Sequence, residues 1–207
     1  MTKTFPLFVL LLAAALVAPA QSGRRIAPRP AEPTPPVQPA TPAPPPAVSP
    51  RPPDPGVVPE SVMGREFQSL QGGRIRLADY GGKVVVLNLW ATWCGPCRRE
   101  MPELEQARRS YAGRGVEFVA LSVEDSATSA DKVRGFVREV GLGARVGWID
   151  RESAVALMRG QSSIPQTFVI DGDGRLVRRL RGYAPGRSME MLRDAIDAAL
   201  GGPATGR

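Results

Sequence analysis

The clearest hydrophobic pattern in the chain is the short apolar run at residues 83–90, which reads KVVVLNLW. Its β-branched residues and its length predict a buried strand. In the residues that follow, from Arg98 to Tyr111, apolar and polar positions recur at helical spacing. The pattern therefore predicts a strand, a tight turn and a helix in direct succession.

The same criteria predict a series of strands and helices in the rest of the C-terminal part. Glu66–Leu70 and Arg74–Leu77 flank Gln71-Gly72-Gly73, which indicates an N-terminal β-hairpin. The turn sequence DGDG at residues 171–174 indicates a second, antiparallel hairpin. Residues 61–201 are thus expected to form one α/β domain. Its further strands are expected at Val116–Val123, Val146–Ile149, Thr167–Ile170 and Leu176–Arg181, and its further helices at Ser129–Val140, Ser153–Arg159 and Arg187–Leu200.

The N-terminal residues 1–22 have the features of an export segment. Residues 5–20 are nearly all apolar and follow Lys3, and Ala18-Pro19-Ala20 offers small residues for a signal-peptidase site. The apolar run is short for a membrane span of about 20 residues. Arg24 and Arg25 would lie on the exported side, which disfavours a retained anchor. A cleaved signal peptide and an uncleaved membrane anchor both remain open.

The composition changes abruptly after this segment. Between Ala27 and Pro59, 15 of 33 residues are proline. Such a sequence lacks backbone donors and cannot bury a core, and it favours polyproline II. We expect residues 23–60 to form a disordered linker, either without a role or as a stiff spacer of up to roughly 100 Å. Residues 202–207 are expected to be a disordered tail.

The two cysteines of the chain lie in one pentapeptide, WCGPC, at residues 93–97. Cys94 follows the predicted strand and begins the predicted helix, where free backbone N–H groups and the helix dipole stabilise a thiolate. Cys97 lies one turn further into the helix, where it is shielded and can attack a mixed disulfide formed at Cys94. The pair therefore predicts thiol–disulfide exchange, with Cys94 as the nucleophile and a Cys94–Cys97 disulfide in the oxidised form.

Other uses of a cysteine pair fit the sequence poorly. A structural disulfide across four residues would contribute only about 2 kcal/mol through loop closure. A zinc site needs three or four ligands, whereas the chain has no histidine and no third cysteine. Attachment of a c-type haem requires histidine after the second cysteine, where Arg98 stands. We therefore expect neither a metal nor a cofactor.

Two segments resemble those of a known family. Asn88 to Pro102 (NLWATWCGPCRREMP) resembles the active-site segment of thioredoxin-like proteins, most of all the extracytoplasmic TlpA/ResA type of thiol–disulfide oxidoreductase. Ser163 to Asp171 (SIPQTFVID) is similar to the family segment whose cis-proline faces the cysteines. The resemblance covers roughly Ser61 to Leu200. It implies a thioredoxin-like α/β fold with a central mixed β-sheet flanked by helices, the N-terminal hairpin, and a central αβ insert between Ser129 and Ile149.

The resemblance also suggests which acidic residues take part in catalysis. Asn88 matches a buried Asp that accepts a proton in thioredoxins, and Asn cannot take this role near neutral pH. Glu100 matches a functional Glu of the TlpA/ResA type and lies one helical turn from Cys97. Glu124 and Asp125 match an acidic position near the same site. The alternative for all three carboxylates is an ordinary place on the solvated surface.

The substrate-binding residues are also implied by the resemblance. Trp93 is expected on one side of the cysteines and Ile164 with a cis-Pro165 on the other, while Gly95 and Pro96 separate the cysteines. The Ile164 backbone would pair with an extended substrate strand, which permits broad specificity. Pro102 cannot donate an N–H and is expected to kink the active-site helix.

The charge of the chain excludes little beyond nucleic-acid binding. The formal net charge is +7, but the arginines are spread along the sequence without interleaved aromatic residues or a nucleic-acid motif. This distribution is typical of solvated faces.

Taken with the resemblance, these features predict a monomeric protein-disulfide reductase in the periplasm or another extracytoplasmic compartment, soluble or tethered through its N-terminus. Its partners would be an oxidised protein, such as an apocytochrome c or a copper-site assembly protein, and a membrane thiol-electron transporter as reductant. A thiol oxidase of the same fold and a non-enzymatic Cu(I)-binding assembly factor remain the alternatives.

Overall fold

The computed structural model describes residues 56–201. The expected export segment, most of the expected linker and the expected tail lie outside these residues. The described helices are α1 (Glu60–Met63), α2 (Gly95–Ser110), α3 (Ser126–Val140), α4 (Arg151–Met158) and α5 (Arg187–Ala199), with a 3-10 turn at Leu77–Tyr80. The strands are β1 (Gly56–Val57), β2 (Glu66–Ser69), β3 (Arg74–Arg76), β4 (Val84–Trp90), β5 (Val116–Ser122), β6 (Arg145–Trp148), β7 (Gln166–Ile170) and β8 (Arg175–Arg181).

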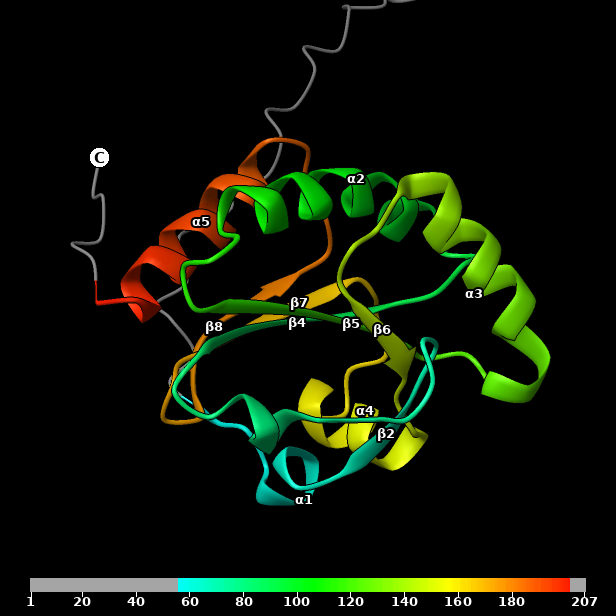
Figure 1. The fold of residues 1–207 in the computed structure, drawn as a ribbon, viewed down its shortest axis with the longest axis horizontal. Coiled ribbons are helices and arrows are strands. Elements are labelled where there is room, and N and C mark those ends of the chain that lie inside the picture. The colour runs from blue at the N-terminus through cyan, green and yellow to red at the C-terminus, as the bar shows by residue number, and fades with distance from the viewer. Residues whose placement is uncertain (1–55, 202–207) are drawn as a thin grey trace, which may run out of the picture. The chain divides into compact units, whose positions relative to one another are not determined.

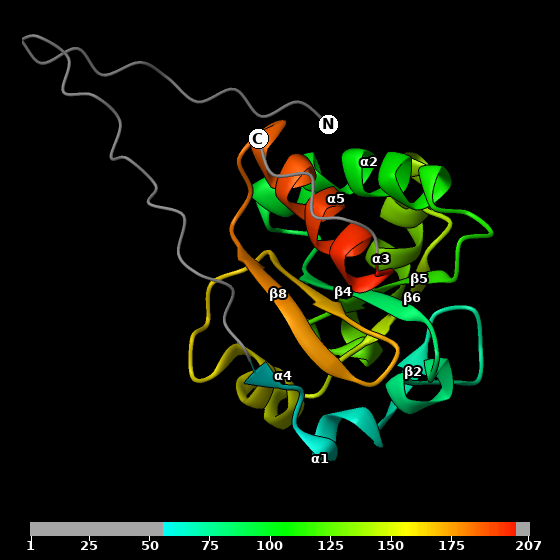
Figure 2. The same ribbon diagram turned by 90° about the vertical axis from the view of Figure 1, so that its left-hand side faces the viewer.

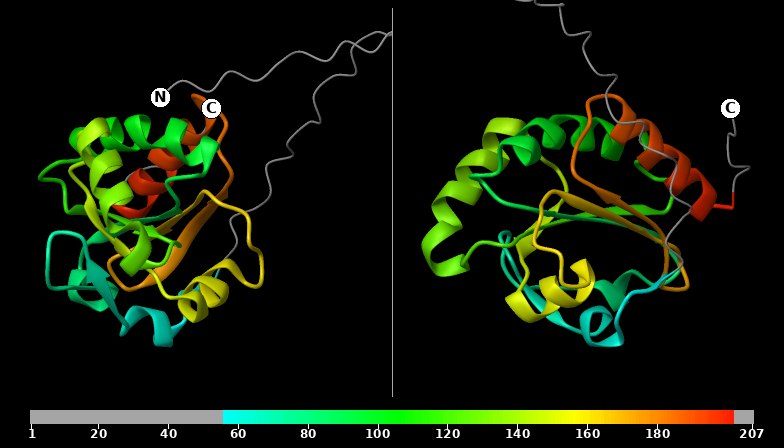
Figure 3. Two further views of the ribbon diagram at one scale, coloured as in Figure 1. Left: turned by 90° about the vertical axis from the view of Figure 1, so that its right-hand side faces the viewer. Right: turned by 180° about the vertical axis from the view of Figure 1, so that it is seen from behind.

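Strand β4 organises the domain because all its residues are buried. It lies inside an eight-stranded mixed sheet of order β1-β8-β7-β4-β5-β6-β2-β3, parallel to β5 and antiparallel to β7. Helices α2, α3 and α5 cover one face of the sheet, while α1 and α4 cover the other (Figure 1). The side and rear views show the same two layers (Figures 2 and 3).

Alternate residues of β4 enter two separate cores. Val86 and Trp90 belong to the core beneath α2, α3 and α5, whereas Leu87 and Leu89 belong to the core on the α1 and α4 side. This follows from the two-residue period of a strand. Asn88, the one polar residue in β4, therefore points to the α2 face of the sheet.

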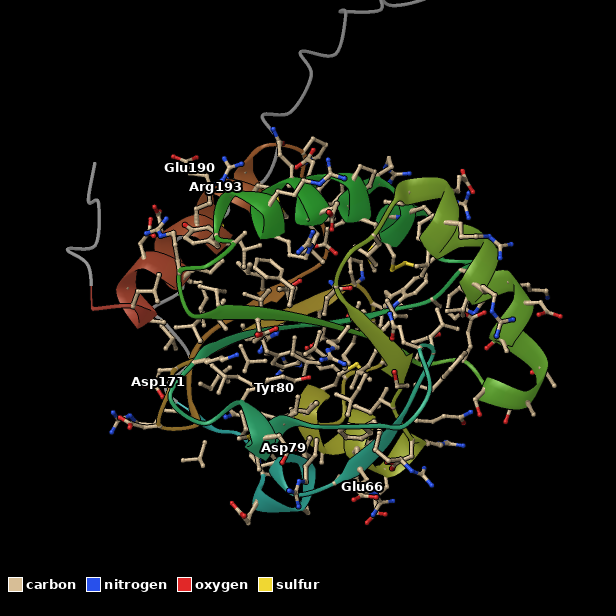
Figure 4. All side chains as sticks on the ribbon, in the orientation of Figure 1. Glu66, Asp79, Tyr80, Asp171, Glu190 and Arg193 are labelled. Atoms are coloured by element: carbon tan, nitrogen blue, oxygen red, sulfur yellow. A yellow bond between two sulfur atoms is a disulfide. The ribbon has the colours of Figure 1, made fainter. Side chains whose placement is uncertain are left out.

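Charged side chains lie on the outer sides of the molecule. Glu190 and Arg193 project from the outer side of α5, while Glu66 and Asp79 lie in the opposite layer (Figure 4). Among residues 56–201, none of the helices has the length and apolar composition needed to cross a membrane.

The structure confirms the expected fold class, both hairpins and the central strand, and the expected insert appears as α3 and β6. It corrects one boundary. Residues 56–60, which composition assigned to the linker, belong to the domain, because β1 pairs with β8 and Val58 is buried. Helix α2 begins at Gly95, with Cys94 as its N-cap and Pro96 in its first turn, in agreement with the predicted helix start at Cys94.

A close approach of two strands requires glycine at position 147. A Cβ on Gly147 would lie 2.4 Å from the backbone oxygen of Gln68 in β2. The glycine therefore lets the N-terminal hairpin pair with β6 and extend the sheet beyond the parallel strands.

A buried carboxylate fixes the C-terminal part of α2 to the loop before β6. Glu105 accepts hydrogen bonds from Arg108 Nε at 2.8 Å, Arg109 Nε at 2.8 Å and the Gly143 backbone N–H at 2.9 Å. Burial opposes ionisation, but these hydrogen bonds prevail and lower the pKa of Glu105 to about 2. The carboxylate is therefore charged at neutral pH and holds the helix to the loop.

Replacing Glu105 with Ala should lower the free energy of unfolding by about 2 kcal/mol, because Arg108, Arg109 and Gly143 all lose a charged acceptor. Urea denaturation of the oxidised protein at pH 7 measures this. The matched control is Gln106→Ala, an exposed neighbour on α2, which should change stability by no more than about 0.5 kcal/mol. Equal stability of the two variants would contradict the role of Glu105.

Candidate active site

The two cysteines form a disulfide where β4 leads into α2. The S–S distance is 2.03 Å. Cys94 is the N-cap of α2, and its Sγ accepts a hydrogen bond from the backbone N–H of Cys97 at 3.2 Å. Free N–H groups at a helix N-terminus stabilise negative charge, so a thiolate at Cys94 would be favoured.

The two sulfur-bearing residues differ in their access to solvent. Cys94 is 5 % exposed and Cys97 is 0 % exposed. The difference is small, but it leaves Cys94 as the residue of the pair that keeps contact with solvent. Cys94 is therefore the member of the pair that an incoming protein disulfide could reach.

The turn before Cys94 is held by Glu124. Its carboxylate accepts hydrogen bonds from the Thr92 backbone N–H at 2.7 Å, from the Thr92 hydroxyl at 2.8 Å and from the Ser122 hydroxyl at 3.0 Å. The adjacent Asp125 caps α3 by accepting from the backbone N–H of Thr128. The structure thus brings Glu124 to the redox turn as an anchor, whereas Asp125 stabilises a helix.

The surface beside the disulfide is formed by residues far apart in the chain. The Trp93 side chain is 70 % exposed. The Ile164–Pro165 peptide bond is cis, as expected. The backbone oxygen of Ile164 lies 3.8 Å from Cys94 Sγ, so this segment lies against the disulfide. The Pro165 carbonyl accepts a hydrogen bond from the Gly182 N–H at 2.8 Å, which joins the segment to the end of β8.

A buried polar network lies behind the cysteines. Asn88 on β4 donates through Nδ2 to Glu100 Oε2 at 3.0 Å and to Thr167 Oγ1 at 2.9 Å. The Thr167 hydroxyl lies 3.3 Å from Glu100 Oε1. Asn88 and Thr167 are direct partners across β4 and β7, and Glu100 comes from α2. Three elements therefore meet in one hydrogen-bonded group.

Glu100 is buried, not on the solvated surface that the sequence left as an alternative. Only 1 % of the surface of Glu100 is exposed to solvent. Burial raises the pKa of the Glu100 carboxyl to about 7, with hydrogen bonds from Asn88 and Thr167 acting in the opposite direction and the nearby Glu103 adding a small increase. A group with this pKa can take up and release a proton near neutral pH.

Sequence reasoning missed two residues of this site. Thr167 lies inside the segment SIPQTFVID, but an uncharged Thr in a predicted strand gives no local sign of a buried polar contact. Thr92 lies two residues before Cys94, and its link to Glu124 depends on the parallel pairing of β4 with β5. The structure places Asn88 and Glu100 in one buried network and brings the Ile164–Pro165 segment beside Cys94.

Comparisons with known proteins agree with this geometry. A model of the redoxin family matches residues 46–196. The chain is 34% identical over 121 residues to the thiol-disulfide oxidoreductase ResA of Bacillus thuringiensis subsp. konkukian, covering 58% of this chain and 68% of ResA. It is 35% identical over 127 residues to ResA of Geobacillus kaustophilus, covering 61% and 71%.

A solved structure agrees as well. A thiol:disulfide interchange protein of the thioredoxin family from Chlorobium tepidum superposes with a TM-score of 0.58 and 27% identity, covering 72% of this chain and 97% of the other. The family match, the ResA relatives and the cysteine pair on a thioredoxin-like fold lead to one assignment. The chain belongs to the redoxin family and is a thioredoxin-like protein-disulfide oxidoreductase of the ResA/TlpA type, with Cys94 and Cys97 as its redox pair.

Proposed function

We propose that this protein reduces disulfides of oxidised extracytoplasmic proteins, with Cys94 as the nucleophile and Cys97 as the resolving thiol. The asymmetry of the pair carries this proposal: Cys94 caps α2 and retains contact with solvent, whereas Cys97 is fully buried. The exposed Trp93 and the Ile164–Pro165 segment flank Cys94, and they supply the surface on which a protein substrate docks.

The reaction has two exchange steps. The Cys94 thiolate attacks one sulfur of the substrate disulfide, which forms a mixed disulfide and releases the other substrate sulfur as a thiolate. The Cys97 thiolate then attacks Cys94 Sγ, releases the second substrate sulfur as a thiolate and leaves the Cys94–Cys97 disulfide. Two electrons have passed to the substrate. A membrane thiol-electron transporter reduces the pair again.

Glu100 accepts the proton that Cys97 must lose before it attacks. Glu100 lies three residues after Cys97 on the same buried side of α2, and its pKa of about 7 suits proton transfer near neutral pH. Asn88 cannot perform this task, although it occupies the position of the thioredoxin Asp. The carboxylate on the helix thus replaces the carboxylate on the strand.

Substrate recognition depends on shape and backbone contacts. Gly95 and Pro96 separate the cysteines, the Ile164 carbonyl oxygen lies beside Cys94 Sγ, and an extended segment can pair with the Ile164 backbone. Oxidised apocytochrome c or a copper-site assembly protein is the substrate class that the likeness to ResA favours. The N-terminal segment would export the domain or tether it to the membrane.

The redox potential tests the direction of the reaction. The dipeptide Gly95-Pro96 contributes no cation of its own, so within this motif the thiolate is stabilised by the helix end. A potential of about −250 mV is expected from the thioredoxin end of the scale. Equilibration with glutathione buffers of known ratio, followed by alkylation and mass analysis, measures it.

The matched variant is Pro96→His, which adds an imidazole beside the pair. It should raise the potential by about 30 mV or more, equal to about 1.4 kcal/mol of stabilisation of the reduced form. A wild-type potential of about −120 mV, which is typical of strong oxidants, would reverse the assigned direction of electron transfer.

The order of attack is open to a separate test. After reduction, iodoacetamide at slightly acidic pH should label Cys94 before Cys97, because only Cys94 combines contact with solvent and stabilisation by the helix N-terminus. A Cys97→Ser variant should accumulate mixed disulfides with substrate, while Cys94→Ser should not. Faster labelling of Cys97 would exchange the two roles.

The buried Glu100 should make stability depend on pH. Its folded pKa of about 7 exceeds the unfolded value of 4.5, so between these values the folded state binds more protons than the unfolded state. The free energy of unfolding should therefore fall as pH rises through this window, by about 3 kcal/mol in total, and the Glu100 contribution should level off above pH 7.

The Glu100→Gln variant isolates this contribution. Urea denaturation of both oxidised proteins at pH 5 and pH 8 should show that the variant gains stability relative to the wild type at the higher pH. A stability difference that stays constant between the two pH values would show that Glu100 does not titrate in this range.

A further inference from the structure

In the network of Asn88, Thr167 and Glu100, Thr167 is an uncharged residue whose hydroxyl is bonded to both other members. We propose that Thr167 is a positioning residue that directs its hydroxyl proton at the Glu100 carboxylate and so decides how readily this group accepts a proton. The proposal deepens the proposed function, since it rests on Glu100 as the proton acceptor of Cys97.

The direction of the hydrogen bonds follows from counting protons. The amide of Asn88 has two N–H groups, one directed at Glu100 Oε2 at 3.0 Å and one at Thr167 Oγ1 at 2.9 Å. Since the Thr167 oxygen already accepts from Asn88, its single proton is available for Glu100 Oε1 at 3.3 Å. Both oxygens of the carboxylate therefore face a donor.

The orientation of Asn88 supports this reading. Its Oδ1 atom is buried and has no hydrogen-bond partner among the described residues. The reverse orientation would place that oxygen against the Glu100 carboxylate and the Nδ2 donors away from it. The observed arrangement leaves one acceptor unsatisfied and gives both donors to the network, as an ionised Glu100 requires.

Besides the neutral Asn88 and Thr167, few groups within residues 56–201 act on the proton affinity of Glu100, and each can be named. On α2, Glu103 raises the pKa of Glu100, and Cys97 lies one turn away. Tyr183, in the loop between β8 and α5, donates to Glu103 Oε1 at 2.5 Å. Strands β4 and β7 present only the neutral Asn88 and Thr167. The two hydrogen bonds are thus the effects that counter the desolvation of Glu100.

The position of Thr167 links the proton affinity of Glu100 to the substrate-binding surface. It lies two residues after Pro165, whose preceding carbonyl group contacts the disulfide. The strand that begins beside the substrate surface therefore also carries the donor to the proton acceptor.

The test replaces one hydroxyl. Thr167→Val keeps the shape of the side chain, and loss of the donor should raise the pKa of Glu100 by about one pH unit, a tenfold change in proton affinity. Thr167→Ser should keep the wild-type value, and Thr167→Ala serves as a second variant without the hydroxyl should Thr167→Val fail to fold. Ser129→Ala, which removes a buried hydroxyl bonded to Trp148, is the control outside the network.

The titration is followed in the oxidised protein by infrared spectroscopy of the protonated carboxyl band, which Glu100→Gln identifies by its absence. This readout does not need a substrate. An upward shift in Thr167→Val or Thr167→Ala, but not in Thr167→Ser or Ser129→Ala, supports the proposal. An unchanged midpoint in the variants without the hydroxyl overturns it.

The pH dependence of disulfide reduction separates this proposal from the proposed function. If Glu100 accepts the Cys97 proton, the rate at pH 7 should fall in Thr167→Val and recover at higher pH. A shifted infrared midpoint with an unshifted rate profile supports the role of Thr167 and overturns the role of Glu100. A shifted rate profile with an unchanged infrared midpoint overturns the role of Thr167.

Discussion

The burial of β4 on both faces is the constraint on which the rest of the structure depends. Because helices cover the two sides of the sheet, alternate residues of one short strand enter two dry cores. The strand delivers the chain to the N-terminus of α2, where Cys94 becomes the cap. Glu124 then fixes the intervening turn to the neighbouring parallel strand through Thr92. The sheet thus sets the position of the redox pair, and the N-terminus of α2 favours a negative charge on Cys94.

The same helix shows how environment decides the chemistry of a carboxylate. Glu100 and Glu105 are both buried on α2. Two guanidinium groups and a backbone N–H face Glu105, and its pKa lies at about 2. A neutral amide and a hydroxyl donate to Glu100, and burial outweighs them and raises its pKa to about 7. One residue is therefore a permanent charge that joins two parts of the fold, while the other can exchange a proton near neutral pH.

The buried Glu100 network also shows a conflict between stability and proton transfer. Keeping a carboxyl group in the interior disfavours its charged form, and the buried Asn88 Oδ1, which has no hydrogen-bond partner within residues 56–201, adds a cost of its own. Such costs concentrate at functional sites, where a polar group is retained for its chemistry. The surrounding packing of Trp90, Met101 and Leu104, each almost fully buried, offsets them.

Much of this protein could be read from the sequence, because strands, helices and redox motifs are encoded locally. The apolar run at residues 83–90 determined β4, WCGPC determined a thiol pair at a helix start, and SIPQTFVID indicated the cis-proline segment. The prediction from composition was wrong at residues 56–60. The prolines around them indicate a linker, whereas β1 forms by pairing with β8. Tertiary structure alone decided that Glu100 is buried, that Glu124 and not Asp125 reaches the redox turn, and that Thr167 joins the network. These contacts depend on strand register, such as Asn88 opposite Thr167, and register between residues so far apart leaves no local pattern in the chain.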